Sequence, residues 1–192
     1  MSQFSWSFTT PLPKLKASGG NGILRFDAGD EVAEVFLEHN IIKSVRYTDA
    51  KGSVLIPQSE SKMITVGEDN HERDVHHFLY PSGPAPTMRL GLTVHKGEGS
   101  WSSLPHDFEL HTEPDFEEVF FYLLEGSTQR AIQVGNGVWS DNAKVDSCWP
   151  VQDRTFSAIP MGYHPVVGEP KVKVSYVWAY LCKHPRWEKV DF

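Results

Sequence analysis

The stretch GEGSWSSLPHDFELHTEPDFEEVFFYLLEG, residues 97–126, decides the predicted fold. It places a histidine shortly after a glycine, then a glutamate at the start of an aromatic strand, and then a glycine that closes a hairpin. A second stretch, IPMGYHPVVG at residues 159–168, supplies a Pro-x-Gly turn followed by another histidine. Imidazole and carboxylate are ligands that a borderline divalent ion accepts, so the two stretches could supply ligands to one shared metal ion.

The rest of the chain consists of short β-rich runs separated by Gly, Pro, Asn and Asp, a pattern typical of sandwiches and barrels. The run VKVSYVWAYL, residues 172–181, alternates partly and is rich in Val and Tyr, so we expect a long strand with one face in the core. The run DEVAEVFLEH, residues 30–39, fits a helix or a strand, and we expect a strand. An all-β fold with almost no helix is therefore predicted.

A barrel made of these strands can bring distant ligands together. Inward-facing residues alternate with outward-facing ones along each strand, so a histidine just before one strand and a histidine on the opposite hairpin can face each other across the lumen. Such a site keeps an open coordination position for a substrate or a water molecule. The pattern thus indicates a metal-binding barrel.

The two ends of the chain differ in character. Before about Met63 the predicted strands are short and polar, whereas after it they are longer and carry the titratable residues. A chain of 192 residues is long enough for one main barrel with an appendage. We predict an accessory β-sheet in residues 1–62 and the metal-binding barrel in residues 63–192.

The composition of the chain limits the kinds of binding partner and the cellular location that we expect. The net charge of -7, from 18 Lys and Arg against 25 Asp and Glu, would repel a phosphate backbone, so no nucleic-acid partner is expected. The sequence contains no run of about 18 apolar residues and no basic start followed by an apolar run, so we expect a cytoplasmic protein without a membrane partner. The two cysteines form no C-x-x-C pair, and we expect reduced thiols.

Four segments of the sequence carry a family resemblance. TVGEDNHERDVHHFL, GSWSSLPH, FEEVFFY and GYHPVV resemble successive signatures of the 5-deoxy-glucuronate isomerase family of inositol breakdown, which belongs to the cupin superfamily and is related to the uronate ketol-isomerases of pectin breakdown. The resemblance runs from about residue 64 to residue 187. It implies a cupin fold, a double-stranded β-helix or jelly-roll barrel, with residues 1–62 corresponding to a truncated first half of two-barrel relatives.

The resemblance also implies a set of metal ligands. His106 would be the first ligand, Glu118 the carboxylate of the aromatic strand, and His164 the last ligand. The ion could be Zn, Mn, Fe or Ni, because imidazole and carboxylate ligands suit all four.

The second ligand departs from the family pattern. The family usually has His-x-His at this point, whereas this chain has Phe108 where the second histidine should lie. Glu109 or His111 could substitute, and Glu109 needs the smaller shift in register. Neither lies on the same face as His106 in a regular strand, so a bulge or a loop is required.

The activity implied by the resemblance is aldose–ketose isomerisation of a sugar acid. In that reaction a base carries a proton between two carbons, and Glu109 and Glu118 are the candidate bases. Arg73 could pair with the substrate's carboxylate, or it could be held by a nearby acid for structural reasons. Tyr163 and Lys96 are further candidates for polar contacts with the substrate.

Two other functions use the same ligands. One is an iron-dependent cupin dioxygenase, and the other is a non-catalytic cupin with a sugar-binding or regulatory role. Metal content and oxygen consumption would separate the three functions. Exposed strand edges in such barrels are commonly covered by a second subunit, so we also expect a homodimer or a larger homo-oligomer.

Overall fold

The structure, a computed structural model, describes residues 4–10, 12–102 and 116–182. The prediction of an almost purely β-structured chain is confirmed, because the only helical elements among the described residues are two short 3-10 turns, η1 (Gln58–Glu60) and η2 (Asp69–His71). The strands, in chain order, are β1 (Ser5–Phe8), β2 (Lys16–Gly20), β3 (Ile23–Asp27), β4 (Val32–Glu38), β5 (Ile41–Asp49), β6 (Gly52–Pro57), β7 (Lys62–Val66), β8 (Arg73–Leu79), β9 (Met88–Glu98), β10 (Glu117–Gly126), β11 (Arg130–Val138), β12 (Lys144–Gln152), β13 (Thr155–Ile159), β14 (Met161–Tyr163), β15 (Val166–Gly168) and β16 (Val172–Leu181). No helix in the described part of the chain has the length and the apolar character needed to cross a membrane.

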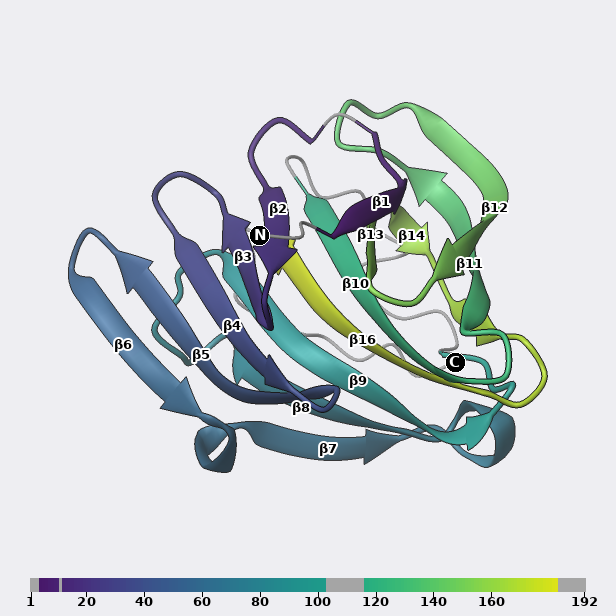
Figure 1. Ribbon diagram of the computed structural model, residues 1–192. Helices are drawn as coiled ribbons and strands as arrows, with labels where there is room; N and C mark the ends of the chain where they lie inside the picture. The colour runs from purple at the N-terminus through teal and green to yellow at the C-terminus, as the bar shows by residue number, and fades with distance from the viewer. Residues whose placement is uncertain (1–3, 11, 103–115, 183–192) are drawn as a thin grey trace.

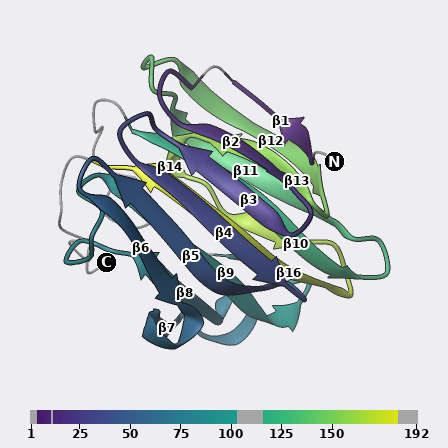
Figure 2. The same ribbon diagram turned by 60° about the vertical axis from the view of Figure 1, so that its left-hand side comes forward.

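The strands form three sheets (Figure 1). A seven-stranded sheet has the order β1-β13-β10-β16-β9-β8-β7, and a four-stranded sheet has the order β12-β11-β14, with β15 also paired to β11. These two sheets enclose the barrel interior. A five-stranded sheet, β2-β3-β4-β5-β6, lies against the outer face of the seven-stranded sheet, as Figure 2 shows.

The five-stranded sheet is a meander of neighbouring strands joined by tight turns. His39 and Asn40 form the two-residue turn between β4 and β5, with φ angles of 49° and 62°. Positive φ at both central residues is typical of the turns whose twist matches a hairpin, and Asn adopts this conformation readily. The segment at residues 30–39, for which helix and strand were both open, therefore contains strand β4 and ends in a hairpin turn.

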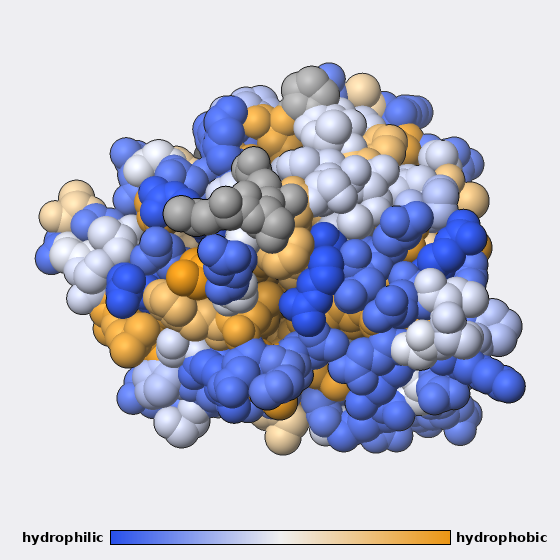
Figure 3. All heavy atoms as spheres, viewed as in Figure 1, coloured by the Kyte–Doolittle hydropathy of each residue, from blue (hydrophilic) through white to orange (hydrophobic). Residues whose placement is uncertain are grey.

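The two faces of the seven-stranded sheet pack into two different hydrophobic cores. On β10, Val119, Phe121 and Leu123 belong to the core shared with the five-stranded sheet, whereas Phe120 and Tyr122 belong to the core inside the barrel. Successive side chains of a strand point to opposite faces, so this one strand contributes to both cores. The view of Figure 1 shows a mostly hydrophilic surface with hydrophobic side chains gathered over the five-stranded sheet (Figure 3).

Buried carboxylates tie the N-terminal part of the chain to the barrel. The Glu117 carboxylate accepts hydrogen bonds from the backbone N–H groups of Lys14, at 3.0 Å, and of Leu15, at 2.6 Å. Glu31, which precedes β4, accepts a hydrogen bond of 3.0 Å from the backbone N–H of Thr87. Hydrogen bonds to a charged acceptor are stronger than neutral ones, so these contacts hold the N-terminal part of the chain firmly against the barrel.

The boundary predicted at residue 62 stays a prediction. The five-stranded sheet lies wholly within residues 16–57, and β7 begins at Lys62. One strand of the N-terminal segment nevertheless belongs to the seven-stranded sheet, because β1 pairs in parallel with β13. The N-terminal segment is therefore interleaved with the barrel at this edge.

Candidate metal centre

Glu118 and His164 meet inside the barrel. The Oε2 atom of Glu118 lies 3.5 Å from the Nε2 atom of His164, and the two side chains are 4% and 6% exposed. Glu118 is the second residue of β10, and His164 lies in the short connection between β14 and β15. Two of the residues proposed as ligands, far apart in the sequence, are thus brought to one point.

The pairing of β10 determines the direction of Glu118. This strand lies between two antiparallel neighbours, with Glu118 opposite Ile159 of β13 and opposite Tyr180 of β16. Because a strand with partners on both sides cannot rotate, the alternation along it directs Glu118 into the barrel and Glu117 to the outer face. The neighbouring carboxylates therefore have separate surroundings.

A buried glutamine holds the backbone at His164. The Nε2 group of Gln133, on β11, donates hydrogen bonds to the carbonyl oxygens of His164, at 2.6 Å, and of Pro165, at 3.1 Å. The Tyr122 hydroxyl donates in turn to the Oε1 atom of Gln133 at 2.8 Å. This chain of hydrogen bonds fixes the backbone from which the imidazole of His164 extends into the barrel.

A glycine allows the strand before His164 to approach its neighbour. Gly162 has a φ of 120°, and a Cβ atom there would lie 2.4 Å from the carbonyl oxygen of Asn136. Only glycine combines this conformation with such a close contact. The Pro-x-Gly turn seen in the sequence thus has a steric reason, which is to bring β14 against β11.

Burial keeps the imidazole of His164 neutral. Removal from water lowers the pKa of His164 to about 4, and hydrogen bonds with backbone groups at Gly162 and Pro160 offset part of this effect. Near pH 7 the ring therefore carries a nitrogen lone pair, which is the form that binds a metal. Phe120 packs edge-on against the ring, with centroids 5.9 Å apart, and shields it from water.

The donor set fits a divalent metal as far as the structure describes it. A neutral imidazole nitrogen and a carboxylate oxygen, both buried, are suitable ligands for a borderline ion, which needs three or four protein ligands. Within residues 4–10, 12–102 and 116–182, no group of three His, Cys, Asp or Glu side chains is close enough to hold an ion. The predicted ligands His106 and Glu109, and the alternative His111, lie outside the described residues.

The predicted substrate-binding residues have different locations. Arg73 begins β8, pairs across the sheet with His95, and donates a hydrogen bond of 2.9 Å to the carbonyl oxygen of His71. The hydroxyl of Tyr163 accepts a hydrogen bond of 3.0 Å from the indole N–H of Trp101. Arg73 and Tyr163 thus remain candidates for contacts with a substrate in the barrel.

Lys96 is not brought to the Glu118–His164 pair. Its ammonium group binds the carboxylate of Asp74, on the outer face of the seven-stranded sheet. Partial burial raises the pKa of Asp74, but the hydrogen bonds from Lys96 and Thr65 and the charge of Lys96 together outweigh it, so the pKa is lowered. We therefore leave Lys96 out of the proposed site.

Sequence reasoning missed several polar residues that line the barrel interior. Tyr176 of β16 stacks on Phe120 with ring centroids 4.4 Å apart, and burial raises its pKa. His95 of β9 is completely buried, and burial lowers its pKa to about 3. The alternation within VKVSYVWAYL could have indicated Tyr176, but the burial of His95 depends on strand pairing that no local pattern reveals.

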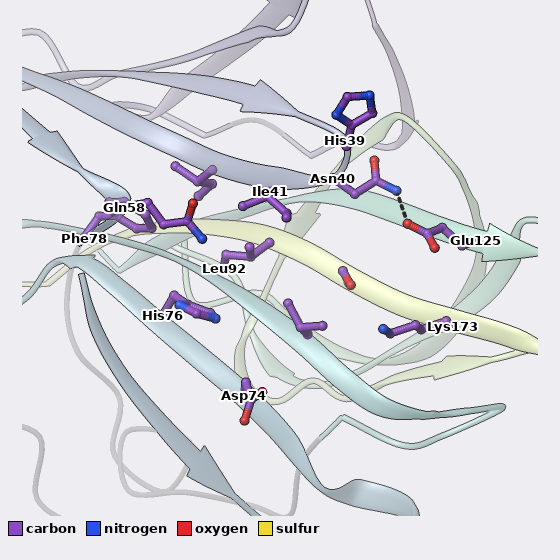
Figure 4. A pocket seen from close by; sticks show the side chains of 13 residues that line it. His39, Asn40, Ile41, Gln58, Asp74, His76, Phe78, Leu92, Glu125 and Lys173 are labelled. Atoms are coloured by element: carbon purple, nitrogen blue, oxygen red, sulfur yellow. Dashed lines mark hydrogen bonds between the residues drawn. The ribbon is translucent and has the colours of Figure 1, made fainter. Parts of the chain in front are cut away.

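A surface cleft of about 290 Å³ lies elsewhere, between the five-stranded and seven-stranded sheets (Figure 4). Asn40 on one side of this cleft donates a hydrogen bond of 2.6 Å to Glu125. Asp74, His76 and Lys173 line the same cleft. All of these residues lie on the outer side of the seven-stranded sheet, so the cleft is separate from the candidate metal centre.

Known proteins place the chain in a family. The KduI/IolB family matches residues 32–192. The 5-deoxy-glucuronate isomerase of Geobacillus kaustophilus (strain HTA426) is 31% identical over 155 residues, which cover 77% of this chain and 55% of that protein. The protein of the same name from Geobacillus thermodenitrificans (strain NG80-2) is 32% identical over 127 residues, which cover 64% of this chain and 45% of that protein. The chain thus spans about half the length of the curated relatives it matches.

A solved structure supports the same placement. The crystal structure of an IolB-like protein from Salmonella typhimurium LT2 superposes with a TM-score of 0.62 at 19% identity, covering 98% of this chain and 78% of that one. The predicted all-β cupin fold is thereby confirmed. Taken with the match over residues 32–192, the barrel and its sequence show that this chain belongs to the KduI/IolB family.

Proposed function

We propose that this chain is a metal-dependent isomerase that interconverts the aldose and ketose forms of a sugar acid, with 5-deoxy-glucuronate or a close analogue as substrate. The observation that carries the proposal is the buried Glu118–His164 pair, with 3.5 Å between oxygen and nitrogen. The name shared by relatives about 31% identical to the chain supports the choice of reaction and substrate. The reaction fits into the sugar-acid branch of inositol breakdown.

Four residues form the proposed metal site. They are His106, Glu109, Glu118 and His164, with His111 as the alternative to Glu109. The neutral imidazole of His164 and the carboxylate of Glu118 suit Zn, Mn, Fe or Ni. A bound divalent ion would supply Lewis acidity, which polarises a carbonyl group and stabilises negative charge on oxygen.

The side chains have separate tasks in the proposed reaction. The isomerisation moves one proton from carbon 2 to carbon 1 and another from one oxygen to the other, so it is redox-neutral and needs no external oxidant. Glu109, where His111 replaces it as a ligand, or Glu118, where it binds the ion loosely, takes the carbon-bound proton and returns it to the neighbouring carbon. The guanidinium group of Arg73 binds the substrate's carboxylate with two parallel hydrogen bonds and orients the chain of the sugar.

The aromatic residues of the interior exclude water from the reacting end. Phe120 and Tyr176 stack at 4.4 Å, and the edge of Phe120 covers the imidazole of His164. Electrostatic interactions are stronger in such a dry environment than in water. The same packing also fixes the position of His164 relative to Glu118.

The test combines metal analysis with turnover. Purified protein should contain a divalent metal and convert 5-deoxy-glucuronate, followed by NMR, whereas His164→Ala should lose both properties. His39→Ala is the matched control, because His39 is 89% exposed and lies in a hairpin turn of the five-stranded sheet. Metal-loaded protein that leaves 5-deoxy-glucuronate and a panel of uronic acids unchanged would overturn the proposal. Oxygen consumption by that metal-loaded protein would indicate a dioxygenase, whereas protein that is purified without any metal would indicate a binding or regulatory cupin.

A further inference from the structure

A buried histidine of β9 lies inside the barrel and takes no part in the proposed metal site. His95 has no exposed surface, and its Nδ1 atom lies 2.8 Å from the hydroxyl oxygen of Ser100. Ser100 is itself buried and follows the end of β9. A histidine held this firmly presents its other ring nitrogen, Nε2, in a defined direction.

The hydrogen bonds of Ser100 determine where the imidazole carries its proton. The Ser100 hydroxyl has one hydrogen, which it donates to the carbonyl oxygen of Gly97 at 2.9 Å. Its oxygen must therefore accept from His95, so the proton of the neutral ring lies on Nδ1. The Nε2 atom then carries a lone pair and acts only as a hydrogen-bond acceptor.

This acceptor is buried without a protein donor in the part of the chain that the structure describes. No group in residues 4–10, 12–102 or 116–182 makes a hydrogen bond to the Nε2 atom of His95. A buried acceptor without a partner is costly, and natural proteins keep few of them. Protonation of Nε2 does not remove this free-energy cost near neutral pH, because burial and the nearby charge of Arg73 lower the pKa of His95 to about 3. A ligand that donates a hydrogen bond would satisfy the atom.

The neighbours of His95 indicate what kind of ligand that is. Arg73 and His95 are direct cross-strand partners of β8 and β9, so their side chains lie next to each other on one face of the sheet. The ring of His95 packs edge-on against Tyr176, with centroids 6.1 Å apart. Burial raises the pKa of Tyr176, the positive charge of Arg73 lowers it, and the negative charge of Glu118 raises it, so both charges act on this hydroxyl group.

We propose that His95 is a specificity-determining residue whose Nε2 atom accepts a hydrogen bond from a substrate hydroxyl next to the carboxylate bound by Arg73. This inference rests on the proposed function. A guanidinium group only donates and the Nε2 atom only accepts, so together they match a hydroxy acid, whose carboxylate accepts and whose hydroxyl donates. Because carbon 5 of 5-deoxy-glucuronate carries no hydroxyl, the matching group is the hydroxyl at carbon 4.

The inference predicts how strongly the site selects for that hydroxyl. A substrate without it would leave the Nε2 atom buried and unsatisfied in the complex, and sites of this kind discriminate strongly. The wild-type protein should therefore convert 5-deoxy-glucuronate with a kcat/KM roughly 10- to 100-fold higher than that for the 4,5-dideoxy analogue. Ser100 acts only through His95, so it is a positioning residue.

Two variants separate the acceptor from the rest of the ring. His95→Asn keeps an N–H donor near the position of Nδ1 and removes the acceptor, whereas His95→Gln places an amide near the position of Nε2. The Asn variant should lower the preference for the 4-hydroxyl to about 3-fold or less, since the interaction worth roughly 10- to 100-fold is gone. The Gln variant should retain part of this preference, and both variants should keep the metal content of the wild type.

Two readouts keep the inference separate from the proposed function. The ¹⁵N chemical shifts of the imidazole of His95 in the wild-type protein report which nitrogen is protonated, whether or not the protein turns over any substrate. A proton on Nε2, or an unchanged preference for the 4-hydroxyl in His95→Asn, would overturn the inference while the isomerase activity stands. If the wild type is inactive, the proposed function fails; calorimetric binding of the two sugar acids to wild type and His95→Asn then tests His95, and equal affinities would overturn its role.

Ser100→Ala and Ser100→Thr test the positioning role. Removal of the hydroxyl frees the proton to move to Nε2, so Ser100→Ala should change the ¹⁵N spectrum of His95 and reduce the preference for the 4-hydroxyl. Ser100→Thr keeps the hydroxyl and should restore both properties. A Ser100→Ala variant with the spectrum of the wild type would contradict the assignment of the proton.

Discussion

Glutamine substitutions at the neighbouring carboxylates Glu117 and Glu118 should produce opposite defects. Glu117 faces the N-terminal part of the chain, where its Oε2 atom accepts hydrogen bonds from the backbone N–H groups of Lys14 and Leu15. The N–H group of Lys14 is shared with the Oε1 atom, at 3.1 Å. In Glu117→Gln the amide oxygen can replace only one carboxylate oxygen, and the NH₂ group then faces an N–H donor. The loss of charge-assisted bonds and this donor–donor contact should cost about 1–3 kcal/mol of unfolding free energy.

Glu118→Gln should leave stability nearly unchanged and weaken metal binding. The substitution keeps the shape of a side chain that is 4% exposed but removes a buried charge, which is neutral or stabilising in a metal-free protein. Loss of even an outer-shell partner lowers metal affinity by roughly 10- to 100-fold, so loss of this carboxylate should exceed about 100-fold.

Both effects can be measured on the same two proteins. Urea unfolding of the metal-free variants, followed by tryptophan fluorescence, gives the free energy of unfolding, and calorimetric titration with Zn or Mn gives the affinity. The m-value should stay constant, because neither substitution changes the area buried on folding. The reasoning is refuted if Glu118→Gln loses stability and keeps its metal while Glu117→Gln does the reverse, since the two side chains would then face the other way.

Two further predictions concern the interior of the barrel. Gly91→Ala should destabilise the protein by about 1–3 kcal/mol in urea unfolding, because the added Cβ would lie 2.2 Å from Trp178 and 2.4 Å from the carbonyl oxygen of His76. Gly97→Ala, whose Cβ would have its closest contact at 3.9 Å, is the matched control, and an equal loss in both would contradict the steric argument. Because the pKa of His95 is about 3 in the folded protein against 6.5 when unperturbed, its stabilising contribution is complete above pH 6.5 and is lost as the pH falls toward 3. Between about pH 7.5 and 5.5 the wild type should lose about 1.4 kcal/mol more unfolding free energy than His95→Asn, and parallel pH curves would show that the ring is not buried as a neutral group.

Local patterns were sufficient to predict the all-β character of the chain and many of its strands. The strand predicted at residues 172–181 coincides with β16, and the segment at residues 30–39 contains a strand as expected. Alternation and turn residues act within a few positions of the chain, so they can be read without knowledge of the partner strands. The Pro-x-Gly turn before His164 belongs to the same class of signal, and its steric role at Gly162 agrees with it.

The sheet pairing could not be predicted in the same way. β1 pairs in parallel with β13, and the hydroxyl groups of Ser7 and Thr155, 148 positions apart, are 2.5 Å from each other. Such a contact depends on the fold of the whole chain, because the entropy lost in bringing two distant strands together is offset only when the strands pair. The interleaving of the N-terminal segment with the barrel is therefore invisible in the sequence.

The candidate site shows the same division. The sequence by itself determined that Glu117 and Glu118 lie on opposite faces of one strand and that Glu118 and His164 are metal-ligand types in a matching family pattern. Only the tertiary structure decided that Glu118 faces inward within 3.5 Å of His164, and that His95 lies buried beside Arg73, with no hydrogen-bond partner for its Nε2 atom among the described residues. The physical reason is that alternation is a property of one strand, whereas burial depends on which distant strands cover each of its faces.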